Sequence, residues 1–100
     1  MTVVSDTSPI TNLAAIGQLN LLRNLYGNIT IPEAVYAELT DLDIPVAGTT
    51  EVQTLAWIQT RPVANRNLVA RLEQELDAGE SEAIALAIEQ KPCFSFFLWI

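Results

Sequence analysis

The sequence has no histidine and a single cysteine, and each shortage excludes a class of chemistry. Without histidine there is no Ser-His-Asp catalysis, no histidine acid–base chemistry and no His-ligated zinc. The lone Cys93 excludes an internal disulfide and the usual cysteine-based zinc sites. A bound metal would therefore need oxygen ligands, which favour Mg²⁺ or Mn²⁺.

Membrane and export signals are also missing. The first residues lack a basic region followed by an apolar core, so no signal peptide is predicted. The apolar stretch 94–100 is too short to span a bilayer. We therefore expect a cytoplasmic protein with no membrane association.

Positive charge is scarce. The chain has 5 Lys and Arg and 12 Asp and Glu, which gives a net charge of −7. This is the wrong sign for a protein that holds nucleic acid by a general basic surface. If the protein acts on RNA, a bound cation or a basic partner must offset the repulsion. The acids also fit a plain role in solubility. Arg61, Arg66 and Arg71 suit phosphate contacts, but a solvated surface role is the commoner one.

The length of 100 residues, half of them apolar, predicts a single domain over 1–100 with a modest core. Short β-branched runs indicate strands, and apolar residues three and four apart indicate helices. The predicted order is strand 2–4, helices 10–16 and 19–25, strand 28–31, helix 33–39, loop 41–50, helix 51–57, strand 58–63, helix 65–76, a buried helix within 76–89, and a strand-like run in 91–100. This order predicts a three-layer α/β domain with a mostly parallel central sheet.

The first candidate site residue is Asp6, which ends the opening strand. Thr7 and Ser8 follow with hydroxyls suited to helix capping, and Pro9 suits the first helical position. An acid between a buried strand and a helix lies at the carboxyl edge of the sheet, where open α/β folds place their ligands. A turn or capping role for Asp6 explains this segment equally well.

Three glutamates near predicted helix ends are further candidates. Glu80 and Glu82 lie in the first turn of the buried helix, where the positive end of the helix dipole also explains them. Glu38 lies toward the negative end of its helix, so the dipole does not explain it.

Three segments resemble the PIN-domain family, in particular a bacterial and archaeal branch related to VapC-type toxins. They are Val3-Val4-Ser5-Asp6-Thr7-Ser8-Pro9, Ile31-Pro32-Glu33-Ala34-Val35-Tyr36-Ala37-Glu38-Leu39 and Leu76-Asp77-Ala78-Gly79-Glu80-Ser81-Glu82-Ala83-Ile84-Ala85-Leu86-Ala87. Each motif is weak by itself, whereas all three in order are fairly specific. The resemblance covers about residues 1–90 and implies a PIN-like fold.

The resemblance also implies an endoribonuclease that depends on Mg²⁺ or Mn²⁺ and cuts single-stranded or structured RNA. Asp6 matches the first family acid, Glu38 the second and Glu82 the third, with Glu80 a close alternative. Ser8 matches a hydroxyl position that helps to order the metal shell. A toxin of a toxin–antitoxin pair is implied, with RNA as substrate, a cognate antitoxin as partner and a homodimer as one assembly.

These residue types suit that chemistry. Hard divalent cations prefer carboxylate and water oxygens. A bound metal lowers the pKa of a water molecule that attacks the phosphodiester. Clustered carboxylates repel one another, so at least one should have a raised pKa without metal.

The last ten residues, Lys91 to Ile100, depart from the family pattern. Family members have an apolar strand that ends in one or two further acids, followed by glycine and a basic residue. Because Trp99 is encoded by TGG and the Ile100 codon begins AT, the frame one base earlier reads Leu, Met or Val followed by Asp. T-rich codons explain apolar residues in every frame but not this Asp. We therefore hypothesise a truncated or frameshifted member that lacks its C-terminal part, which the downstream coding DNA would test.

Two other interpretations stay open. The chain is a non-catalytic PIN-like binding module that meets a partner through apolar surfaces, or an inactive gene remnant. A stable complex without metal binding favours the first, and poor solubility with rapid proteolysis favours the second.

Overall fold

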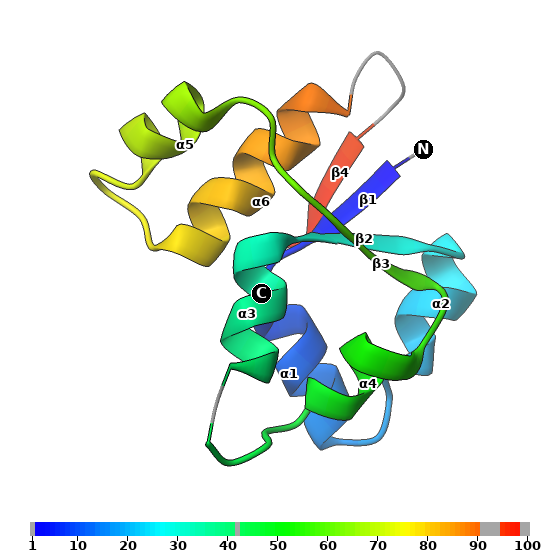
Figure 1. Ribbon diagram of the computed structural model, residues 1–100. Helices are drawn as coiled ribbons and strands as arrows, with labels where there is room; N and C mark the ends of the chain where they lie inside the picture. Colours follow the sequence, from blue (N-terminus) through cyan, green and yellow to red (C-terminus); the bar gives the residue numbers. More distant parts are fainter. Residues whose placement is uncertain (1, 42, 91–94, 99–100) are drawn as a thin grey trace.

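Short strands and helices alternate through the computed structural model, which describes residues 2–41, 43–90 and 95–98 (Figure 1). The elements are β1 (Thr2–Ser5), α1 (Thr7–Ala15), α2 (Asn20–Tyr26), β2 (Ile29–Pro32), α3 (Glu33–Thr40), α4 (Thr49–Thr54), β3 (Ile58–Arg61), α5 (Arg66–Leu72), α6 (Ala78–Glu89) and β4 (Ser95–Leu98). The predicted α/β class is confirmed.

The sheet has the strand order β3-β2-β1-β4, and every neighbouring pair is parallel. Val4 lies opposite Thr30 on β2 and opposite Phe97 on β4. In a parallel sheet the carboxyl ends of the strands meet at one edge. The ends of β1 and β2 therefore bring Asp6 and the start of α3 to the same side of the molecule.

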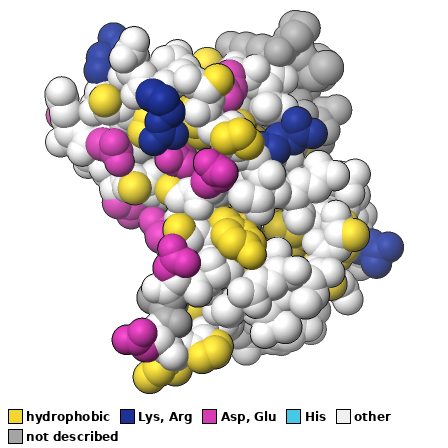
Figure 2. Space-filling model, in the orientation of Figure 1, with side chains coloured by type: hydrophobic (Ala, Val, Ile, Leu, Met, Phe, Trp, Pro, Cys, Tyr) yellow, Lys and Arg dark blue, Asp and Glu magenta, His cyan; other side chains and the backbone are white. Residues whose placement is uncertain are grey.

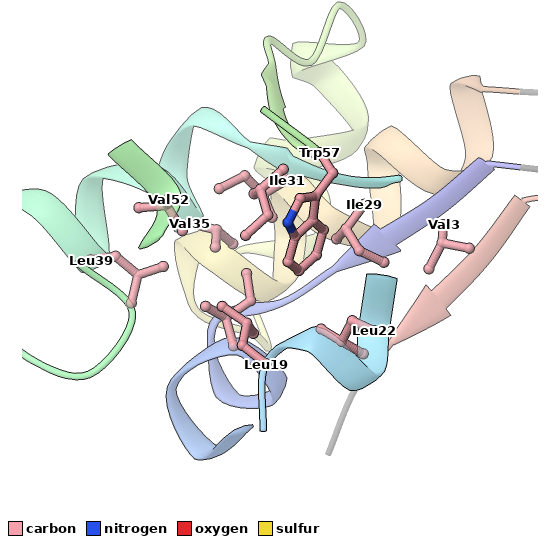
Figure 3. Packing of buried hydrophobic residues seen from close by; sticks show 11 residues of the cluster. Val3, Leu19, Leu22, Ile29, Ile31, Val35, Leu39, Val52 and Trp57 are labelled. Atoms are coloured by element: carbon pink, nitrogen blue, oxygen red, sulfur yellow. The ribbon is translucent and has the colours of Figure 1, made fainter. Parts of the chain in front are cut away.

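Two cores lie on opposite faces of the sheet, because successive strand residues point to opposite faces. Val3 belongs to one core and Val4 to the other. The larger core packs α1, α2, α3 and α4 against the sheet, and Figure 3 shows Trp57 among its aliphatic side chains. The smaller core packs α5 and α6 against Val4. The result is the predicted three-layer arrangement.

Several predicted helix boundaries were wrong, including both ends of α4 and the end of α5. The helix predicted at 51–57 is α4, which begins at Thr49 inside the predicted loop and ends at Thr54. The Thr49 hydroxyl explains the early start, because it accepts a hydrogen bond from Val46 N and donates to the Leu39 carbonyl. The helix predicted at 65–76 ends at Leu72, where hydrogen bonds of a tighter turn replace the helical pattern.

The predicted strand-like run in the last ten residues corresponds to β4, whose backbone pairs with β1. The hypothesis of a frameshift concerns Trp99 and Ile100, which lie outside the described residues. None of the described helices combines the length and the apolar character needed to cross a bilayer.

Candidate functional site

Asp6 lies where β1 gives way to α1, and it caps the helix. Its Oδ1 atom accepts a hydrogen bond from the backbone N–H of Thr7 at 2.8 Å. The side chain is buried, with the residue 4% exposed. Burial raises the pKa of the Asp6 carboxyl, and the charges of Asp77, Glu80 and Glu38 raise it further, against the lowering effect of the Thr7 N–H. Burial is thus the main cause of the raised pKa of Asp6, and the neighbouring acids add to it.

Thr7 joins the first two candidate acids. Its N–H donates to Asp6, and its hydroxyl donates to Oε2 of Glu38, 31 residues along the chain. The helices that carry these groups, α1 and α3, pack against the same face of the sheet. One residue therefore fixes the carboxylates of Asp6 and Glu38 as neighbours.

The start of α6 adds more negative charge beside this pair. Asp77 caps α6, because its Oδ1 atom accepts a hydrogen bond from Glu80 N at 2.8 Å. The charges of Asp77 and Glu80 both act on Asp6. Figure 2 shows acidic side chains gathered along the hollowed side of the molecule, where α3 faces α6. Of the two glutamates predicted at this helix start, Glu80 is the one whose charge acts on Asp6.

Glu82 lies in a different environment, and its charge is compensated. The residue is 8% exposed, and its Oε1 atom accepts a hydrogen bond from Ala34 N at 3.0 Å. Its Oε2 atom forms an ion pair with Nη1 of Arg66 at 2.9 Å. Ala34 lies in the first turn of α3, where the helix dipole favours a negative charge. In this structure Glu82 therefore ties α3 and α5 to α6.

The supporting hydroxyl predicted at Ser8 lies half-buried in the first turn of α1. The hydroxyl that donates to Glu38 is instead that of its neighbour Thr7. From the sequence, Thr7 was expected only as a capping residue, and Asp77 was not among the candidate site residues. Asp77 and Glu80 have the three-residue spacing of a helix cap, which is the signal that could have identified Asp77.

The donor set suits a hard divalent cation in its chemistry. Asp6, Glu38 and Glu80 offer carboxylate oxygens of the kind that Mg²⁺ and Mn²⁺ prefer. A cation beside them would offset the repulsion that raises the pKa of Asp6. Within the described part of the chain, however, no three acidic or cysteine side chains converge on one point as they now lie. Cation binding would thus require a third carboxylate, such as that of Glu80, to turn toward Asp6 and Glu38.

A hollow of about 440 Å³ lies elsewhere, near the amino ends of β2 and β3. It is lined by Asn20, Arg23, Asn28, Thr54, Leu55, Ala56 and Trp57. Its lining contains no acid, so it has no part in the chemistry considered for Asp6.

A family model described as PIN domain, DUF3368, matches residues 2–94 of the chain. This range includes all three segments on which the resemblance rests. No curated protein and no solved structure matches the chain.

Proposed function

We propose that this chain, which belongs to the PIN-domain family, is a ribonuclease that uses Mg²⁺ or Mn²⁺ at the carboxyl edge of its sheet. Membership of the family indicates a nuclease-type function. The observation that supports the finer proposal is the pairing of Asp6 and Glu38 through Thr7. Asp6 also caps α1, but that structural role does not require a second acid beside it.

In this proposal Asp6, Glu38 and Glu80 hold the cation, and Glu82 is the further ligand that the family resemblance implies. A bound divalent cation supplies a water of lowered pKa for attack on the phosphodiester, and it stabilises negative charge on the phosphate. The chain itself contributes orientation, because the Thr7 hydroxyl fixes the Glu38 carboxylate beside Asp6. Arg66 neutralises Glu82, and this pair would have to open before Glu82 could bind a cation.

RNA, an antitoxin and a second copy of the chain are the proposed partners. Because the net charge is −7, RNA would be repelled except where a cation reduces the repulsion, which supports a substrate site at the acidic edge. The VapC-like resemblance supports a cytoplasmic toxin whose cleavage is restrained by a cognate antitoxin. Exposed apolar side chains such as Ile16, Leu25 and Ile44 offer surface for such a protein to cover.

The test is cleavage of a labelled single-stranded RNA by the purified chain with Mg²⁺, with Mn²⁺ and with a chelator. We expect cleavage that needs the cation and is lost in Asp6→Asn. The matched control is Asp43→Asn, which makes the same chemical change at an exposed loop residue and should cleave normally. Cation-dependent cleavage that survives Asp6→Asn would refute the assignment.

The second candidate function is that of a non-catalytic binding module. It is favoured by the finding that no three acidic side chains of the described residues converge on one ion position. Absence of Mg²⁺ and Mn²⁺ binding, together with a stable complex with the product of a neighbouring gene, would support it over the nuclease.

A further inference from the structure

Gly79 lies where α6 meets α3, and the missing side chain leaves room for an acid. A methyl group at Gly79 would lie 2.6 Å from Oε1 and 2.9 Å from Oε2 of Glu38. These separations are well inside the ~3.5 Å at which such atoms attract one another. The Glu38 carboxylate therefore occupies the space that any larger residue at position 79 would fill.

This glycine is not required by the backbone. The glycines with positive φ are Gly17, Gly27 and Gly48, whereas Gly79 is the second residue of α6. Alanine is favoured over glycine in a helix because glycine loses more conformational entropy on folding. A glycine at position 79 therefore stabilises the helix less than an alanine would. The close approach of the Glu38 carboxylate explains why a residue without a side chain is found there.

We propose that Gly79 is a positioning residue for the Glu38 carboxylate. Gly79 bounds the carboxylate on the α6 side, and the Thr7 hydroxyl holds it from α1. Together they fix an otherwise flexible and exposed glutamate next to Asp6. The consequence for cation binding rests on the proposed function, but the contact between Gly79 and Glu38 does not.

The effect of a methyl group at position 79 should fall on the site rather than on folding. The atoms it meets belong to the free end of an exposed side chain, which can swing away at little cost. Gly79→Ala should therefore displace the Glu38 carboxylate from Thr7 while the helix gains intrinsic stability.

The experiment measures Mn²⁺ binding by calorimetry, with Mn²⁺ alone as the probe, together with thermal melting of the full chain. We expect Gly79→Ala to weaken Mn²⁺ binding about 10-fold or more, as loss of ligand-orienting contacts does. Its melting temperature should equal or exceed that of the wild type. The matched control is Ala78→Gly, at the exposed neighbouring position of α6, which should lower the melting temperature and leave Mn²⁺ binding unchanged.

A double-mutant comparison shows whether Gly79 acts through Glu38. In a Glu38→Gln background, Gly79→Ala should weaken Mn²⁺ binding no further. Wild-type affinity in Gly79→Ala, or an equal loss in both backgrounds, would overturn the proposal. If Gly79→Ala melts lower, adding Glu38→Asp should restore the melting temperature, because the shorter acid clears the methyl group. Failure of this rescue also overturns it.

A readout without metal separates this inference from the proposed function. The ¹³C chemical shift of the Glu38 carboxyl should change in Gly79→Ala and stay constant in Ala78→Gly. If the wild type binds no Mn²⁺, the proposed cation site is wrong, and this shift alone decides the role of Gly79. An unchanged shift in Gly79→Ala contradicts the positioning role.

Discussion

Helices α3 and α6 meet at two places, each marked by a glutamate, and the two places differ in how they treat its charge. Glu82 is buried, faces the N-terminal turn of α3 through Ala34 N, and is paired with Arg66. Glu38 is exposed, lies toward the C-terminal end of α3, and receives a neutral hydroxyl from Thr7. Glu82 therefore acts as a structural link in this state.

The side of the contact that carries Glu38 is where we propose that a cation binds. Asp6 lies next to Glu38, and the ion pair found among the described residues belongs to Glu82 instead. Acidic residues at one helix–helix contact can therefore have different roles, depending on whether a charged partner already faces them.

The largest effect is expected when the charge of Glu38 is removed. Glu38→Gln should lower RNA cleavage by more than about 100-fold, the upper end for contacts that only orient a metal ligand. Its free energy of unfolding should change by less than about 0.5 kcal/mol, because the residue is exposed. Glu33→Gln, an exposed acid in the first turn of the same helix, is the control. Equal cleavage by the two variants would contradict the account.

Removal of the Glu82 carboxylate, which is paired with Arg66, should lower the stability of the fold. Glu82→Ala should lower the free energy of unfolding by about 2 kcal/mol, because it leaves Ala34 N without its charged acceptor. Chemical denaturation measures this change. Glu73→Ala, at an exposed acid, should stay within about 0.5 kcal/mol of the wild type. A loss no larger than that control would show that Glu82 is not a structural link.

A smaller effect is expected when the cationic partner is removed. Arg66→Gln should cost roughly 0.5–1 kcal/mol of unfolding free energy, because the Arg66 side chain is 59% exposed and its ion pair is screened by water. Arg66→Gln should also leave the Glu82 carboxylate without its cationic partner and so open to Mg²⁺. Mg²⁺ should then raise the melting temperature of this variant more than that of the wild type. Arg71→Gln on the same helix should do neither. An unchanged Mg²⁺ response would separate Glu82 from the cation site.

The smallest effect is a pH dependence that comes from Asp6. Burial, and then the charges of Asp77, Glu80 and Glu38, raise its folded pKa above the ordinary value of 3.8. At pH values between 3.8 and the raised pKa of folded Asp6, the folded state binds the proton more tightly than the unfolded state. The free energy of unfolding therefore falls as the pH rises through this window. Above this window the stability supplied by protonated Asp6 is lost, a change that Asp6→Asn does not undergo.

Melting curves of the wild type and Asp6→Asn from pH 3 to pH 7 test whether stability falls as the pH rises. The advantage of Asp6→Asn should grow as the pH rises from about 4, where an ordinary carboxyl titrates, and Mg²⁺ should reduce it. A wild type that gains stability relative to Asp6→Asn over this range would mean that the folded pKa is lowered instead.

Much of the fold was predictable because its signals are local. The run Thr2-Val3-Val4 forms β1, and the Ala-rich run after Asp77 forms α6. These segments are specified by β-branching, by helix propensity and by a capping side chain, all within a few residues. The start of α4 was missed because it depends on Thr49 bonding to Leu39, a contact between residues of different elements.

The candidate site was predictable in its residue types but not in its contacts. Asp6 and Glu38 were identified as candidates, yet the hydroxyl that joins them and the space beside Gly79 depend on how α1, α3 and α6 pack. Helix crossing distances cannot be read from spacing along the chain. A glycine inside a strong helix pattern was the one local sign of a close approach.

The most direct measurement is a titration of the ¹⁵N-labelled chain with small amounts of Mn²⁺, which broadens the NMR signals of nearby amides. We expect the strongest broadening around Asp6, Thr7 and Glu38 and at the start of α6, and we expect it to be lost in Asp6→Asn. Strongest broadening around another group of acids, or an equal response in Asp6→Asn, would contradict a cation site at this edge of the sheet.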